Sequence, residues 1–123
     1  PEPAAQPTDR LRKLLALLEK DPHDAFCLYG VAQEHASAGR HKEALAWFDR
    51  TIAADPTSAY AFFHKARSQE ALGQRPAAME TLRQGKAAAT RGQDNHALAE
   101  IQGYLDELED ASAPATLKYR KET

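Results

Sequence analysis

The side chains that could carry out chemistry are scattered along this chain rather than grouped at the spacings of a known active site. The most numerous are histidines, at His23, His35, His41, His64 and His96. No two of them are separated by three residues on one helix, the spacing that would place both imidazoles on one face to bind zinc. The sequence therefore predicts no metal site.

The remaining reactive groups favour structural roles over catalysis. Cys27 is the single cysteine, which excludes an internal disulfide and a cysteine metal cluster. We expect it to be a small, partly buried thiol rather than a nucleophile. Gly39 and Gly73 are typical of turns rather than of a loop that cradles phosphate. The acidic residues at positions 106–110 indicate a solvated helix face, so we predict that the protein is not an enzyme and has no cofactor.

Length, composition and charge narrow the class of protein further. The chain has 123 residues, the size of one domain, and 42% of them are hydrophobic, which is too apolar for disorder throughout. A formal net charge of −2 gives no electrostatic case for binding nucleic acid. No apolar run is long enough to span a membrane. With no signal-peptide pattern at the start, we predict a cytoplasmic location, and a signal removed before Pro1 remains an open alternative.

Apolar residues recur at helical spacing in six segments, which are separated by glycine, proline, aspartate and serine. The predicted units are a half-repeat helix, two helix pairs and a last capping helix, at residues 8–20, 25–58, 59–92 and 94–110. Residues 1–7 are rich in proline and predict a flexible tail. Residues 111–123 predict a disordered tail, with a basic stretch near its end.

The two helix pairs repeat at a fixed interval. Pro22 and Pro56 each follow an aspartate and lie 34 residues apart, and Gly39 and Gly73 are separated by the same interval. A constant period of this length with a break in the middle is the sequence signature of stacked helix–turn–helix repeats. Because one pair cannot bury its apolar stripe alone, the helices at both ends are expected to complete the core.

This pattern resembles the tetratricopeptide repeat family, whose repeats read W-x2-L-G-x2-Y, then A-x3-F, then P. The first repeat matches with Leu28, Val31, Ala32, His35, Ala44, Phe48 and Pro56. The second matches with Phe62, Lys65, Ala66, Gln69, Ala78, Leu82 and Thr90. Three of these residues depart from the family pattern, namely His35, Gln69 and Thr90. The first helix falls into the same register, since Leu11, Leu45 and Met79 are spaced by 34 residues.

The resemblance implies an all-α fold, a right-handed superhelical stack of antiparallel helix pairs with about six helices. Within each pair, small residues are expected to face one another. Ala32 would meet Ala44, and Ala66 would meet Ala78, so that the two backbones can approach closely.

The resemblance also implies a binding surface. In this family the first helices of successive repeats line a concave groove that binds peptides. The groove positions, with one neighbouring histidine, are Phe26, Tyr29, Gln33, Tyr60, Phe63, His64 and Arg67. Aromatic side chains gathered on a surface usually mark an interface, and Arg67 can pair with a ligand carboxylate. The alternative is that Phe26 and Tyr60 pack on neighbouring helices and leave a merely amphipathic groove.

One subset of the family clamps the C-terminal carboxylate of chaperone tails with lysine, asparagine and arginine. This chain has other residue types at those positions, namely Tyr29, Gln33, His64, Asp94 and Leu98. We therefore expect no chaperone-tail clamp of that kind.

Together these features predict a non-catalytic protein–protein interaction module or adaptor, which holds a peptide segment of another protein in an aromatic-lined groove. We expect neither nucleic acid nor a membrane as a partner. The alternative is a structural module that forms a homodimer through its leucine-rich first helix. The residues expected at that contact are Leu11, Leu15, Leu17 and Trp47. The sequence leaves open which protein is bound and in which pathway.

Overall fold

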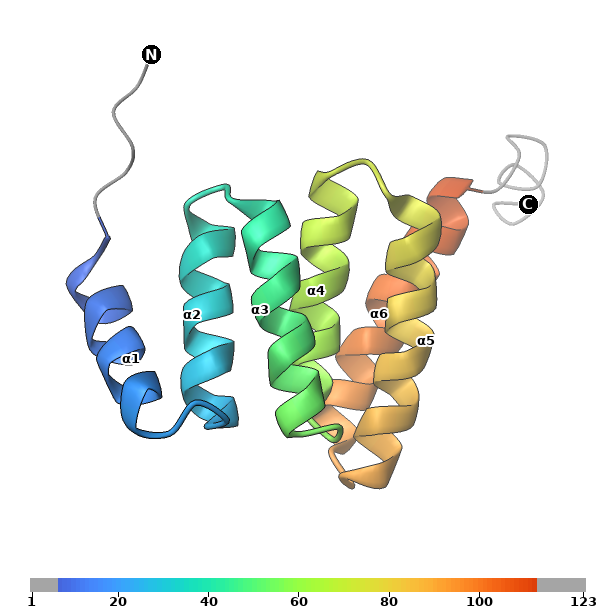
Figure 1. Cartoon of the computed structure of the whole chain (residues 1–123). Helices are drawn as coiled ribbons and strands as arrows, with labels where there is room; N and C mark the ends of the chain where they lie inside the picture. Colours follow the sequence, from blue (N-terminus) through green and yellow to red (C-terminus); the bar gives the residue numbers. More distant parts are fainter. Residues whose placement is uncertain (1–6, 113–123) are drawn as a thin grey trace, which may run out of the picture.

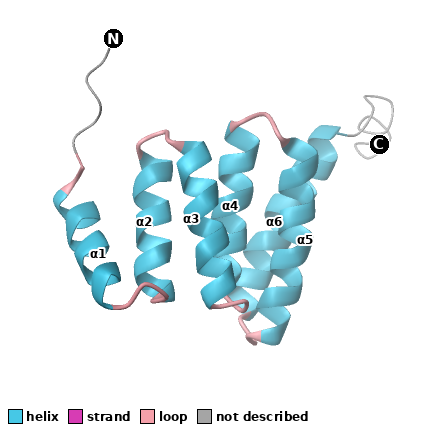
Figure 2. Cartoon of the chain, in the orientation of Figure 1, coloured by secondary structure: helices cyan, strands magenta, loops and turns pink. Residues whose placement is uncertain are grey.

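The computed structural model describes residues 7–112 (Figure 1), so the predicted tails at 1–7 and 111–123 lie almost wholly outside the described residues. Within that range the chain forms α-helices and no strand (Figure 2). The helices are α1 (Asp9–Lys20), α2 (Ala25–Ser37), α3 (His41–Ala54), α4 (Ala59–Ala71), α5 (Arg75–Arg91) and α6 (Asn95–Ser112). The predicted all-α class is confirmed, and α6 continues past its expected end at residue 110.

Short polar side chains start three of the helices, as their positions before the apolar stripes predict. Thr8, Asp24 and Asp94 each accept a hydrogen bond from the backbone N–H three residues further on, at 3.0–3.1 Å. Each bond satisfies one of the donors that a helix leaves unpaired in its first turn. Ser58 precedes α4 in the same way, but its side chain makes no such bond.

The helices form a row in which each lies antiparallel to its neighbour along the chain (Figure 1). α2 packs on α3 and α4 packs on α5, which confirms the two predicted pairs, and α3 joins the pairs through α4. α1 packs on α2 at one end of the row, while α6 packs on α5 and also touches α4 at the other. The buried residues accordingly fall into three clusters along the row.

Small side chains lie at the contacts within each pair. Ala32 and Ala44 in the first pair, and Ala66 and Ala78 in the second, are all fully buried. An alanine side chain ends at Cβ, so helices that meet through alanines can approach closely while larger neighbours fill the space beside them.

Glycine forms the turn inside each pair. Gly39 has a φ of +79° and Gly73 a φ of +77°, in the left-handed region that commonly follows a helix C-terminus. The two turns are therefore alike in the residue type and the backbone conformation that they use.

The two pairs end differently, and the difference follows from one residue. α3 stops before Pro56, because a proline disfavours helical backbone in the residue that precedes it. The equivalent position in the second repeat is Thr90, so α5 runs on for 17 residues against 14 in α3. Gly92, the expected closing residue, has a φ of −85°, and the left-handed position is taken by Gln93.

Candidate functional site

The helices α2, α4 and α6 line a groove that consists of two adjoining pockets. The α2–α4 pocket has a volume of about 350 Å³ and is lined by Gln33, Ala36, Ser37, His41, Phe48, His64, Arg67, Ser68 and Ala71. The α4–α6 pocket has a volume of about 440 Å³ and is lined by Phe63, Arg67, Glu70, Glu100, Gly103, Tyr104 and Glu107. Because Arg67 lines both pockets, they are two halves of one surface with α4 in the middle.

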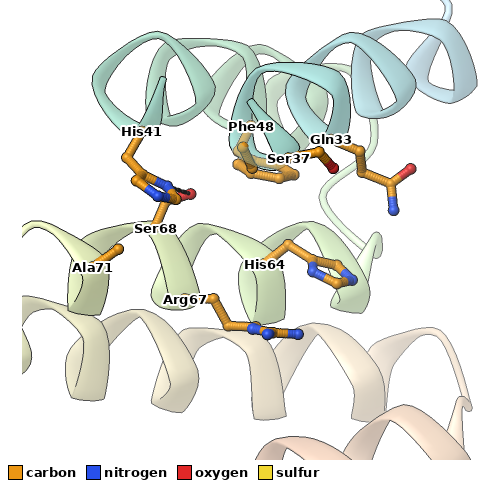
Figure 3. A pocket seen from close by; sticks show the side chains of 9 residues that line it. Gln33, Ser37, His41, Phe48, His64, Arg67, Ser68 and Ala71 are labelled. Atoms are coloured by element: carbon orange, nitrogen blue, oxygen red, sulfur yellow. Dashed lines mark hydrogen bonds between the residues drawn. The ribbon is translucent and has the colours of Figure 1, made fainter. Parts of the chain in front are cut away.

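Side chains from three helices meet in the α2–α4 pocket (Figure 3). Phe48 enters from α3, and His64 and Arg67 face it from α4. His41 Nδ1 lies 3.1 Å from the hydroxyl oxygen of Ser68, which ties the start of α3 to α4. The pocket therefore depends on packing between the two repeats rather than on either repeat alone.

A connected series of rings crosses the groove from α2 to α6. The Tyr29 ring lies 5.9 Å from that of His64, and His64 lies 5.2 Å from Phe63. Phe63 in turn lies 5.4 Å from Tyr104 on α6. These centroid distances fall in the range at which edge-to-face and tilted ring pairs attract each other.

Two further rings widen this series. Phe48 is stacked against His64 at 6.3 Å, with an interplanar angle of 14°. Tyr60 meets Phe63 at 6.2 Å in an edge-to-face arrangement. Phe63 and His64, which are adjacent in sequence on α4, therefore connect the rings of both halves of the groove.

The residues predicted for the groove take three kinds of position. Gln33, His64 and Arg67 line the α2–α4 pocket, and Phe63 and Arg67 line the α4–α6 pocket. Tyr29 and Tyr60 belong to the connected rings. Phe26 stands apart near the start of α2 and is 74% exposed.

Sequence reasoning missed several residues that line the groove. These are His41, Phe48, Glu70, Glu100, Tyr104 and Glu107. Those on α6 were missed because the repeat interval changes. The N-cap residues Asp24 and Ser58 are 34 residues apart, whereas Ser58 and Asp94 are 36 apart. The signal that could have revealed them is the stronger helical capping pattern at Asp94.

Burial and neighbouring charge shift the titration of the groove side chains. Burial, together with nearby Tyr60, raises the pKa of Tyr29 to about 12. Burial also raises the pKa of Tyr104, whose hydroxyl donates a 2.5 Å hydrogen bond to Glu70 Oε1. The pKa of His64 is lowered by burial and then by the positive charge of Arg67. Both tyrosines are therefore protonated and His64 is neutral near pH 7.

Comparison with solved structures decides the family. A tetratricopeptide repeat domain protein from Salinibacter ruber is 30% identical in its solution structure, with 72% of this chain and 90% of that chain covered and a TM-score of 0.67. The chain belongs to the tetratricopeptide repeat family. No protein-family model matches this tetratricopeptide repeat chain, and no curated protein matches it.

Two complexes share the fold at lower identity. PcrH in complex with the chaperone binding region of PopD is 20% identical, with 84% of this chain and 78% of that chain covered and a TM-score of 0.78. The TPR2B domain of yeast Sti1, in complex with pHsp70, is 22% identical, with 82% and 81% covered and a TM-score of 0.76.

The N-terminal end of the tetratricopeptide stack offers a second exposed apolar surface. Leu15 is 38% exposed and Leu17 is 53% exposed. Leu11 is only 4% exposed and packs in the core cluster of α1 and α2, so it does not contribute to this surface, contrary to its expected place there. Trp47 is half-buried, stacked on His35 at 6.2 Å and packed against the same core cluster.

Two searches of the described residues found nothing. Across residues 7–112 there is no group of three or more histidine, cysteine or carboxylate side chains that could hold a metal ion. Across the same residues, no helix combines the length and the apolar character that are needed to cross a membrane.

Proposed function

We propose that this protein is a non-catalytic interaction module that binds a peptide segment of another protein across α2, α4 and α6. The observation that carries the proposal is the connected series of aromatic rings, which crosses the groove from one end to the other. Rings on an open surface offer a ligand a large, stiff contact area at a low cost in side-chain entropy.

The depth and composition of the groove suit an extended chain. Two adjoining pockets, of about 350 and 440 Å³, can each receive one or two side chains of a bound segment. Gln33 and Ser37, at the edge of the α2–α4 pocket, offer polar groups that can pair with its backbone. A groove of this size favours a micromolar Kd, about −8 kcal/mol.

Two structural neighbours support the same use of the fold. PcrH was solved with the chaperone binding region of PopD, and the Sti1 domain was solved with pHsp70. Both were therefore captured with a protein partner. At 20% and 22% identity they support a mode of binding and do not indicate which partner this chain recognises.

The experiment is a selection of peptides from a random library on the immobilised full chain, followed by measurement of their Kd. Truncation of the groove in the variants Phe63→Ala and Arg67→Ala should weaken binding of the selected peptides about tenfold or more. Leu17→Ala removes a similarly apolar, exposed side chain from α1 and serves as the matched control. Arg67 is exposed, so its variant keeps the test valid if Phe63→Ala unfolds. Peptides that bind both groove variants as tightly as the wild type would contradict the groove.

A second candidate function is self-association through α1. It is favoured by the exposure of Leu15 and Leu17 at the end of the row, where α1 has α2 as its main packing partner. A second copy of the chain could cover the two leucines by placing its own α1 against them. Sedimentation at several concentrations should then show a dimer that Leu17→Asp disrupts. A monomer at every concentration, or a dimer that survives the substitution, would exclude this surface.

A further inference from the structure

The two halves of the groove differ in charge. The α4–α6 pocket is lined by the carboxylates of Glu70, Glu100 and Glu107 and by a single cation, Arg67. The α2–α4 pocket is lined by Arg67 and two histidines and by no carboxylate. A ligand that lies across both pockets therefore meets a negative field at one end only, and this gives the groove a direction.

The negative pocket also has aromatic walls. Phe63 and Tyr104 line it with their rings 5.4 Å apart, and Tyr104 holds Glu70 in place through its hydroxyl. Glu100 receives His96 Nε2 at 2.8 Å, on the exposed side of α6. Ring faces next to carboxylates attract a cation twice, through the ring quadrupole and through charge.

The other pocket favours an uncharged side chain. His64 is half-buried, and its neutral ring stacks on Phe48, which is itself fully buried. Ala36 and Ala71 add apolar surface at the far side. An aliphatic or aromatic ligand side chain would bury area here without leaving a charge unpaired.

We propose that the ligand is a segment with a lysine or arginine next to an apolar residue, bound with the cation in the α4–α6 pocket and the apolar side chain in the α2–α4 pocket. This inference rests on the groove being the binding site. It names a partner of opposite charge to one that presents a carboxylate, because an acidic residue in the α4–α6 pocket would face three carboxylates. Arg67, between the pockets, would repel a second cation and so set the register.

The test uses the peptides selected from the random library on the full chain. Lysine and arginine should be enriched beside an apolar position, and a Lys→Glu change in a selected peptide should weaken binding about tenfold or more. The double variant Glu100→Gln/Glu107→Gln should remove the preference for lysine over glutamate. The matched control, Glu19→Gln/Glu80→Gln, changes the net charge equally at exposed positions outside the groove and should keep the preference.

The outcomes separate this inference from the proposed function. Selected peptides with no basic preference, or with an acidic one, whose binding is still lost in Phe63→Ala, would overturn the inference and leave the groove intact. A library that yields no binder would overturn both. The chain has a basic stretch of its own at residues 118–121. If the triple variant Lys118→Gln/Arg120→Gln/Lys121→Gln binds the selected peptides tenfold more tightly, that stretch is the occupant and a separate partner is not.

Discussion

The two complete repeats, α2 with α3 and α4 with α5, use the same backbone scheme and different side chains. Both bring alanines together at the helix contact, and both turn through a glycine with positive φ. The equivalent residues 34 positions apart then diverge. Repeat one has a fully buried Phe48 where repeat two has Leu82, and the half-buried Trp47 corresponds to Thr81.

The polar residue near the end of the first helix shows what this divergence does. In repeat one, His35 Nδ1 accepts a hydrogen bond from Arg40 Nε at 2.9 Å, and its ring stacks on Trp47. In repeat two, the equivalent residue is Gln69, and its buried side-chain oxygen has no hydrogen-bond partner among the described residues. Repeat one thus pairs its buried polar group, whereas repeat two leaves one unpaired at a cost in stability.

The comparison also separates stability from binding. The first helix of repeat two supplies Phe63, His64 and Arg67, which lie at the centre of the groove. The second helix of repeat one supplies Phe48, which serves the core and the groove together. The repeat that is less well satisfied internally therefore carries most of the candidate binding surface, and substitutions can test this division.

The largest effect is expected at Phe48. Phe48→Ala should lower the free energy of unfolding by about 3–5 kcal/mol, because it removes a fully buried ring, and it should also weaken peptide binding. The matched change in repeat two, Leu82→Ala, should cost about 2–5 kcal/mol and leave binding unchanged, because Leu82 lines neither groove pocket. Urea unfolding and peptide titration measure the two properties. Equal losses of binding in the folded variants would contradict the division of roles.

The next effect concerns the alanine contacts, which the two repeats share. Ala32→Leu and Ala66→Leu should each lower stability by about 1–3 kcal/mol, since the added methyl groups have no space between the helices. Thermal melts of both variants provide the measurement, with the exposed Ala46→Leu in α3 as a control that should melt close to the wild type. A variant that melts as late as the wild type would show that its pair is not closely packed.

A smaller effect of opposite sign is expected at the unpaired amide. Gln69→Leu should raise the free energy of unfolding by about 1 kcal/mol, because it removes a buried acceptor that lacks a partner. The same change in repeat one, His35→Leu, should lower it by about 1 kcal/mol, because it breaks the bond from Arg40 and the stack on Trp47. Denaturant titration of both gives the signs. Destabilisation by Gln69→Leu would mean that its amide is paired in solution.

The smallest expected effect is a dependence of stability on pH in the acid range. Burial lowers the pKa of His35 and of His64 below the ordinary value of 6.5. The unfolded chain therefore binds protons more readily, so stability is full above about pH 6.5 and falls as the pH drops through the lowered values. Glu34, whose pKa is lowered by its hydrogen bonds from Thr8 and Arg10, adds a further loss below its ordinary value of 4.5.

Melting temperatures across the acid range measure this dependence. The variant His64→Gln should lose less stability than the wild type between about pH 7 and pH 5, because it lacks one of the groups that titrates. His23→Gln, at an exposed turn position, should follow the wild type. A His64→Gln curve parallel to that of the wild type would show that His64 is not buried as described.

The order of the helices and the pairing of the repeats could be predicted because they depend on local and periodic features. Apolar stripes, caps such as Asp24, turn residues such as Gly39 and the stop at Pro56 all act within a few residues of where they stand. Thr90 shows the limit of this reasoning. It was recognised as a departure from the family pattern, but the extra length that it allows in α5 became visible only in the structure.

The candidate site was predictable in its residues on α2 and α4 and not in those on α6. A fixed period carries a position from Tyr29 to Phe63, and the resemblance supplied the face on which they lie. The longer interval to α6 breaks that register, so no spacing in the sequence indicated that Tyr104 would meet Phe63 and Glu70.

By itself the sequence determined that this chain stacks helix pairs, because residue type and period dictate which faces each helix must bury. Only the tertiary structure decided that Leu11 is buried while Leu17 is exposed, and that three carboxylates from α4 and α6 share one pocket. The physical reason is that burial and electrostatic fields depend on distances between helices. Those distances are set by packing across the whole row and are not encoded in any one segment.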